Sequence, residues 1–238
     1  MDLELKQKQF NAAMERYSTT SGYRLFGKLV ATLNVSLQLY LLMLLQGVSI
    51  GTGWQMVAFF AAFILADFVN GVVHMIMDNN DSYESIAGPL VASFHLHHRT
   101  PMYRENPLHM VYFNESGAKV WLVPYLFAVL LLVALTEPHP VLIHLLVYLG
   151  ILSSVAEVSH YLCHTSTSRL AGFLGRIGLL LGKRHHARHH AADNNNYAFL
   201  NGCSDPLINL IARSFFTGYK KNTDLHYARY EGAGTKNR

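Results

Sequence analysis

The chain contains 14 histidines, and several stand in short clusters whose spacing suits metal binding. The most distinctive cluster is His185-His186-x-x-His189-His190. If this segment is helical, His186, His189 and His190 share one face, where neutral imidazoles can bind a transition metal. The role of His185, as a further ligand or a hydrogen-bonding neighbour, stays open. The alternative for the whole segment 185–190 is a solvated basic cluster without a metal ion.

A second cluster is Glu157-x-x-His160-x-x-x-His164. Steps of three and four residues put these side chains on one helical face. Two histidines four residues apart can hold one metal ion, although the HExxH order of zinc proteases is absent. We therefore predict that His160 and His164 are ligands and that Glu157 has a catalytic role. A pair of interfacial histidines without a ligand is the alternative.

A third set of polar residues interrupts an apolar stretch at Asp67, Gly71, His74 and Asp78. The steps of four, three and four residues again define one helical face. Ionisable groups inside a membrane helix are costly and usually functional. We predict that His74 binds metal and that Asp67 and Asp78 belong to the catalytic site. Asp67 has two open interpretations, as a hydrogen-bonding group between helices or as a residue that orients a ligand.

Weaker candidates lie in a polar segment that we expect to be a loop. They rank His98, His97, His109 and then His95, and the first three are predicted ligands. His226 lies in a polar tail and is not expected to take part.

The elements that must position these residues are apolar helices. Hydrophobic residues make up 51% of the chain and charged residues 14%, against roughly a quarter charged in a soluble domain. The sequence predicts an all-α, polytopic membrane protein with about four transmembrane helices and a cytosolic histidine-rich cap. The predicted helices are Leu29–Gln46, Trp54–Met77, Val120–Thr136 and Val141–Tyr161. Residues 29–206 would form the membrane-embedded domain, between a cytosolic segment (1–28) and an interfacial or cytosolic tail (207–238).

The distribution of Lys and Arg predicts the orientation. Both residue types occur before the first helix, in the central loop and in the C-terminal segment, but in neither hairpin turn. The positive-inside rule then puts both termini and the metal site in the cytosol. His144 would lie at the other side, about 24 Å along the helix from His160. The net charge of +4 forms no basic stripe, so we expect no nucleic-acid partner.

The number of candidate ligands indicates two metal ions. Four ligands would satisfy a structural zinc ion, whereas eight or more converge here. Imidazoles with a few carboxylates suit iron, zinc or copper. Two iron ions beside a membrane suggest activation of O2 against an apolar chain, for which the cofactor supplies the oxidant.

These motifs, together with Asn195-Asn196-Tyr197 and Gly202, resemble the Kua (plasmanylethanolamine desaturase) family of lipid desaturases, including its plant branch that acts on palmitoyl-phosphatidylglycerol. The likeness runs from about residue 62 to 206. Where the family often has a third histidine before the HxxxH pair, this chain has Glu157. The resemblance implies two irons, O2 as co-substrate and a membrane phospholipid substrate. It implies either a vinyl-ether bond in an alkyl-ether lipid or a double bond in an acyl chain, in both cases near the headgroup.

Three other functions stay open. A lipid hydroxylase would use the same two irons, a haem-binding membrane cytochrome would need histidine pairs facing each other within the helices, and a metal transporter would need polar ligands through the membrane. The sequence has no flavin- or ferredoxin-like segment. An external electron donor of the cytochrome b5 or ferredoxin type is therefore expected.

Overall fold

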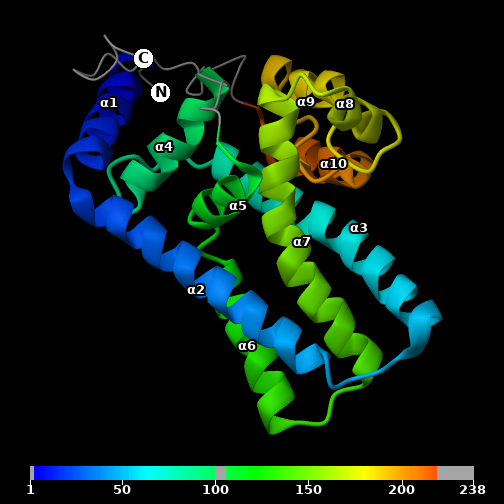
Figure 1. Cartoon of the computed structure of the whole chain (residues 1–238). Helices are drawn as coiled ribbons and strands as arrows, with labels where there is room; N and C mark the ends of the chain where they lie inside the picture. Colours follow the sequence, from blue (N-terminus) through cyan, green and yellow to red (C-terminus); the bar gives the residue numbers. More distant parts are fainter. Residues whose placement is uncertain (1–2, 100–105, 219–238) are drawn as a thin grey trace.

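A computed structural model describes residues 3–99 and 106–218. Within these residues the chain forms ten α-helices and no strand (Figure 1). The prediction of an all-α chain with a histidine-rich cap is confirmed. The helices are α1 (Leu3–Thr19), α2 (Ser21–Leu45), α3 (Gly51–Asp78), α4 (Gly88–Arg99), α5 (Leu108–Ser116), α6 (Leu122–Leu135), α7 (Pro140–Thr165), α8 (Arg169–Arg176), α9 (Lys183–Ala191) and α10 (Asp205–Phe215).

Three of these helices, α2, α3 and α7, are long and apolar enough to cross a membrane. Their outward side chains include Trp54, Phe60 and Ile64, each more than half exposed, as expected of a lipid-facing surface. The fourth predicted span forms the helix α6, which has 14 residues. At 1.5 Å per residue it is about 21 Å long, shorter than the roughly 30 Å hydrocarbon core. The sequence therefore predicted this helix correctly but overestimated its length.

The centre of the bundle is the contact between α3 and α7. Small buried residues, Ala62 and Ala66 on α3 and Ala156 on α7, allow the two helices to approach closely. A buried amide connects α2 to α7. Gln38 donates to the carbonyl of Gly150 and to Ser154 Oγ, so this polar side chain in an apolar helix holds helices together.

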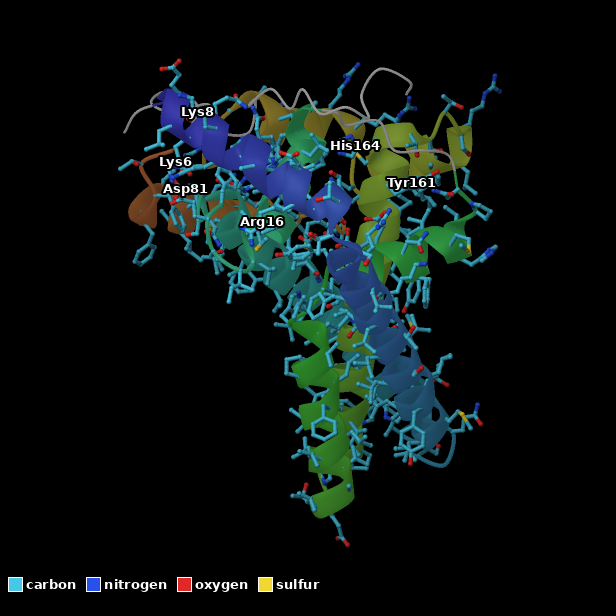
Figure 2. The ribbon with its side chains drawn as sticks, turned by 90° about the vertical axis from the view of Figure 1, so that its left-hand side faces the viewer. Lys6, Lys8, Arg16, Asp81, Tyr161 and His164 are labelled. Carbon is cyan, nitrogen blue, oxygen red and sulfur yellow. The ribbon has the colours of Figure 1, made fainter. Side chains whose placement is uncertain are left out.

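The helices α1, α4, α5, α8, α9 and α10 form a cap around the ends of α3 and α7, whereas α6 packs against α2 and α7 in the bundle (Figures 1 and 2). Gly71 allows α10 and the segment before it to rest on α3, because a Cβ atom there would lie 2.4 Å from Ile208 Cδ1 and 3.0 Å from Ala198 Cα. The predicted domain divisions at residues 28 and 206 stay predictions.

The segment around His95–His98 was predicted to be a loop, and that prediction is wrong. It is the helix α4, which packs against α1 through Val91 and Ala92, in a cluster with Phe10 and Tyr83. Burial of this apolar face stabilises a helix whose sequence has little amphipathic signal.

Candidate metal centre

Three imidazole nitrogens converge at the end of α7. The Nε2 atoms of His160, His164 and His186 lie 2.9, 3.0 and 3.1 Å from one another. Each ring has its N–H or lone pair in the ring plane, so three nitrogens that point at one centre cannot all hydrogen bond to each other. Three ligands at right angles, about 2.1 Å from an ion, would be spaced about 3.0 Å apart. The triad therefore fits a metal ion with octahedral geometry.

A second group consists of His74, His97, His98 and His189, whose candidate ligand atoms all lie within 4.8 Å of one another. Three of these rings have Nδ1 beside a backbone carbonyl, which can only accept, so Nδ1 carries the proton and the Nε2 lone pair faces the group. The bonds are His74 Nδ1 to Tyr197 O at 2.7 Å, His97 Nδ1 to Phe94 O at 2.6 Å and His189 Nδ1 to Asn195 O at 3.0 Å.

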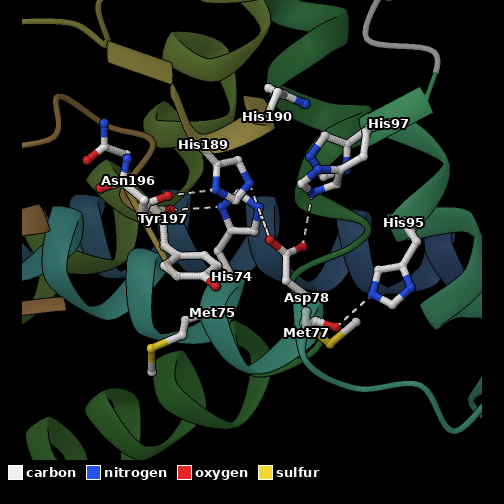
Figure 3. Close-up of polar contacts among 12 residues, drawn as sticks. His74, Met75, Met77, Asp78, His95, His97, His189, His190, Asn196 and Tyr197 are labelled. Carbon is white, nitrogen blue, oxygen red and sulfur yellow. Dashed lines mark hydrogen bonds and ion pairs between the residues drawn. The ribbon is translucent and has the colours of Figure 1, made fainter. Parts of the chain in front are cut away.

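Asp78 completes the second group (Figure 3). Its Oδ2 lies 3.4 Å from His74 Nε2 and 3.2 Å from His189 Nε2, and its Oδ1 lies 3.2 Å from His98 Nε2. Asp78 Oδ2 and His74 Nε2 are buried and have no hydrogen-bond partner among the described residues. Acceptors that face each other in a buried site repel unless a cation lies between them. This donor set of imidazoles with one carboxylate suits iron, zinc or copper.

The two groups are neighbours. The His97 and His160 rings are 5.5 Å apart between centroids. His190 lies between the groups, with its ring 4.8 Å from that of His98 and 5.1 Å from that of His164, and its Nε2 is 3.0 Å from His186 Nε2. Two ions held by these residues would be adjacent.

The histidines of the cap are set to be neutral. Burial lowers the pKa of His97 to about 4 and that of His190 to about 2, and it holds the pKa values of His98 and His186 well below their usual range. Neutral imidazole is the form that binds metal. At neutral pH the cap therefore presents lone pairs, not protons, to an ion.

The comparison with protein families agrees with this geometry. The model of the lipid desaturase domain matches residues 63–218. The chain belongs to this family. A protein of Arabidopsis thaliana named Fatty acid desaturase 4, chloroplastic, is 28% identical over 148 residues, which are 60% of this chain and 44% of that protein. The chain thus spans less than half the length of that relative. No solved structure matches the chain.

Asp67 accepts hydrogen bonds from the turn around Asn201 and lies in neither histidine group. Its Oδ1 accepts the N–H groups of Leu200, Asn201 and Gly202, and its Oδ2 accepts the N–H and hydroxyl of Ser204. The turn that Asp67 anchors follows Tyr197, whose carbonyl orients His74. Asp67 therefore fixes the turn that follows Tyr197, and a part for Asp67 in orienting a metal ligand stays a prediction.

Glu157 is held in an ion pair. Its Oε1 lies 2.9 Å from Lys119 Nζ, which also donates to Asn70 Oδ1 and lies over the Phe199 ring. Glu157 is in neither histidine group. The sequence analysis missed Lys119, although a lone lysine at the start of an apolar segment is a signal that could have found it.

Several other histidines lie outside both groups. His109 is exposed on α5. His95 is buried between Tyr83 Oη and the Met77 carbonyl, and His185 binds Asp205 at 2.5 Å. His144 lies near the start of α7, with Nδ1 on the Pro140 carbonyl, far from His160 as predicted. His226 lies outside the described residues.

Proposed function

We propose that the chain is a di-iron, O2-dependent desaturase that removes two hydrogens from adjacent carbons of a membrane phospholipid, near its headgroup. The observation that carries this proposal is the pair of adjacent histidine groups at one end of the membrane helices. Iron bound there would supply, with O2, an oxidant strong enough for an apolar C–H bond.

The chain's own residues would bind the two irons and orient the histidine rings. His160, His164 and His186 would hold one iron, and His74, His97, His98 and His189 would hold the other, with His190 and Asp78 at their edges. The carbonyls that fix the Nδ1 protons keep the Nε2 lone pairs aimed at the ions. Glu157 and Asp67 would support the site without touching the reacting atoms.

The position of the groups supports a reaction near the headgroup. His74 and Asp78 lie in the last two turns of α3, and His160 and His164 lie in the last two turns of α7. These helix ends would lie at the membrane surface. Phe199 lies 5.4 Å from both His74 and His160 between ring centroids, so an apolar wall borders both groups and would help to exclude water.

The substrate to test first is a phospholipid acyl chain, because the similar Arabidopsis protein is named as a fatty acid desaturase. An alkyl-ether lipid that would become a vinyl ether is the second. The positive-inside rule favours a cytosolic site, and electrons would come from a separate cytochrome b5 or ferredoxin.

The test combines metal and lipid analysis. The full chain is expressed in a host that lacks such lipids, purified for iron analysis, and its membranes are extracted for mass spectrometry. About two irons per chain and a lipid lighter by two hydrogens would support the proposal. A product heavier by one oxygen would identify a hydroxylase, and a Soret band would identify a haem protein. His144→Ala is the control, with full iron and product expected, whereas His164→Ala should lose one of the two irons and all of the product.

A further inference from the structure

The helix α9 has two faces of opposite character. One face carries three candidate ligands, the buried His186 and His189 and the partly buried His190. The other face exposes Lys183, Arg184, Ala187 and Arg188. The helix contains no acidic residue. Three cations therefore lie about one helix diameter, roughly 10–12 Å, from the candidate metal centre.

Within the part of the chain that the structure describes, these cations are not paired with carboxylates. Lys183, Arg184 and Arg188 form no ion pair with any residue in 3–99 or 106–218. Like charges that close together repel each other and weaken the short helix. The chain tolerates this cost at a place that faces away from the hairpin turns of the bundle, on the outer side of the cap (Figure 1).

The reaction requires electrons from outside the chain. Desaturation converts –CH2–CH2– and O2 into –CH=CH– and two H2O. Reduction of O2 to water takes four electrons, of which the two broken C–H bonds supply two. A donor must supply the other two electrons, together with two protons from solvent.

We propose that the exposed face of α9, formed by Lys183, Arg184 and Arg188, is the docking and electron-entry surface for a small acidic electron-carrier protein. This inference rests on the proposed function. A negatively charged carrier would be steered to the cationic face. Once docked there, it would be separated from the metal ligands by α9 alone.

The neighbouring helix α8 suits a different partner, and the contrast favours a protein on α9. α8 begins at Arg169 and ends at Arg176, and between them it exposes Leu170 and Phe173; Ile177, directly after the helix, is also exposed. Such a mixture of basic and large apolar side chains is typical of a helix that lies in a membrane surface. The outer face of α9 exposes no large apolar side chain that could enter a bilayer. Its charges face water, where protein partners approach.

The experiment uses charge reversal on iron-loaded full chain in nanodiscs of neutral lipid. The test variant is Arg184→Glu with Arg188→Glu. The matched control is Lys8→Glu with Arg16→Glu, which changes the net charge equally at exposed positions of α1 (Figure 2). Reduced [2Fe–2S] ferredoxin and reduced cytochrome b5 are mixed with each protein in separate stopped-flow runs, at several salt concentrations. Dithionite serves as the chemical reductant.

The test variant should be reduced at least about tenfold more slowly by the preferred carrier at low salt, with a flatter salt dependence. It should keep wild-type iron content and reduction by dithionite, and the control variant should behave as wild type. Equal slowing of both variants, or of neither, would overturn the proposal. So would a wild-type chain that dithionite reduces but neither carrier does.

A membrane role for the same face has a separate signature. If Arg184 and Arg188 bind anionic headgroups, the test variant would lose its response to added anionic phospholipid while the carrier still reduced it normally. That result would also overturn the proposal. Failure of the proposed function looks different, because the wild-type chain would then hold no iron or make no unsaturated lipid with any reductant.

Discussion

The substitution Asp78→Asn should weaken iron binding at one of the two histidine groups and not at the other. The carboxylate is fully buried and contacts three histidines of the second group, His74, His98 and His189. Asparagine has nearly the same shape, but its amide nitrogen would donate hydrogen bonds to the Nε2 lone pairs that otherwise face the metal ion. The substitution therefore removes a negative charge and also stabilises the metal-free group.

The expected loss of iron affinity follows from the position of Asp78 beside the second group. Loss of such a partner weakens metal binding by about 10–100-fold, or about 1.4–2.7 kcal/mol. Asp78 lies beside His74, His98 and His189, and the group formed by His160, His164 and His186 does not include it. The variant should thus keep one tightly bound iron and lose the other.

The assay is iron content per chain after dialysis against chelators that buffer free iron over a graded range. Wild type should retain about two irons, and Asp78→Asn should retain about one over a middle range. His164→Ala should also retain about one, and the two changes together should leave none. If Asp78→Asn keeps both irons with unchanged affinity, or loses both together, the division into two groups is wrong.

Three further predictions concern support of the site. Lys119→Met should destabilise the folded chain by about 3–5 kcal/mol, because Glu157 is left without its partner; Glu157→Gln in the same chain should restore most of that loss in a detergent unfolding assay. Asp67→Asn should lower both the unfolding midpoint and iron affinity, since four backbone N–H groups and a hydroxyl lose charged acceptors, whereas His144→Ala should leave both unchanged. The metal-free chain should lose stability as pH falls from 6.5 toward 4, the window between the ordinary pKa of His97 and its lowered value. In this window the unfolded chain binds more protons than the folded one, so unfolding free energy that is flat across this window would contradict burial of a neutral His97.

The ligand sets were predictable where they are local. His160 with His164, and His186 with His189 and His190, lie within one or two turns of a helix, so spacing alone places them on one face. The two groups could not be separated from the sequence, because His186 and His189 are three residues apart yet serve different groups. That division depends on how α9 lies across the ends of α3 and α7.

Long-range contacts account for what the sequence could not supply. Glu157 appeared one turn before His160 as a candidate at the site, but its partner Lys119 is 38 residues away and draws it into an ion pair. Asp67 had two interpretations because its partners begin 133 residues later. The helix at His95–His98 depends on packing against α1, which no local pattern indicates.

The segment from residue 194 to 205 links these contacts into one scaffold. Asn194 and Asn196 adopt positive φ angles of 52° and 56°, a conformation that asparagine tolerates better than most residues. The resulting turns direct the carbonyls of Asn195 and Tyr197, two residues apart, onto His189 and His74, which both belong to the second group. The same segment is then fixed to α3 by Asp67. One irregular segment therefore orients candidate ligands from two different helices, so helical spacing alone does not determine the geometry of this site.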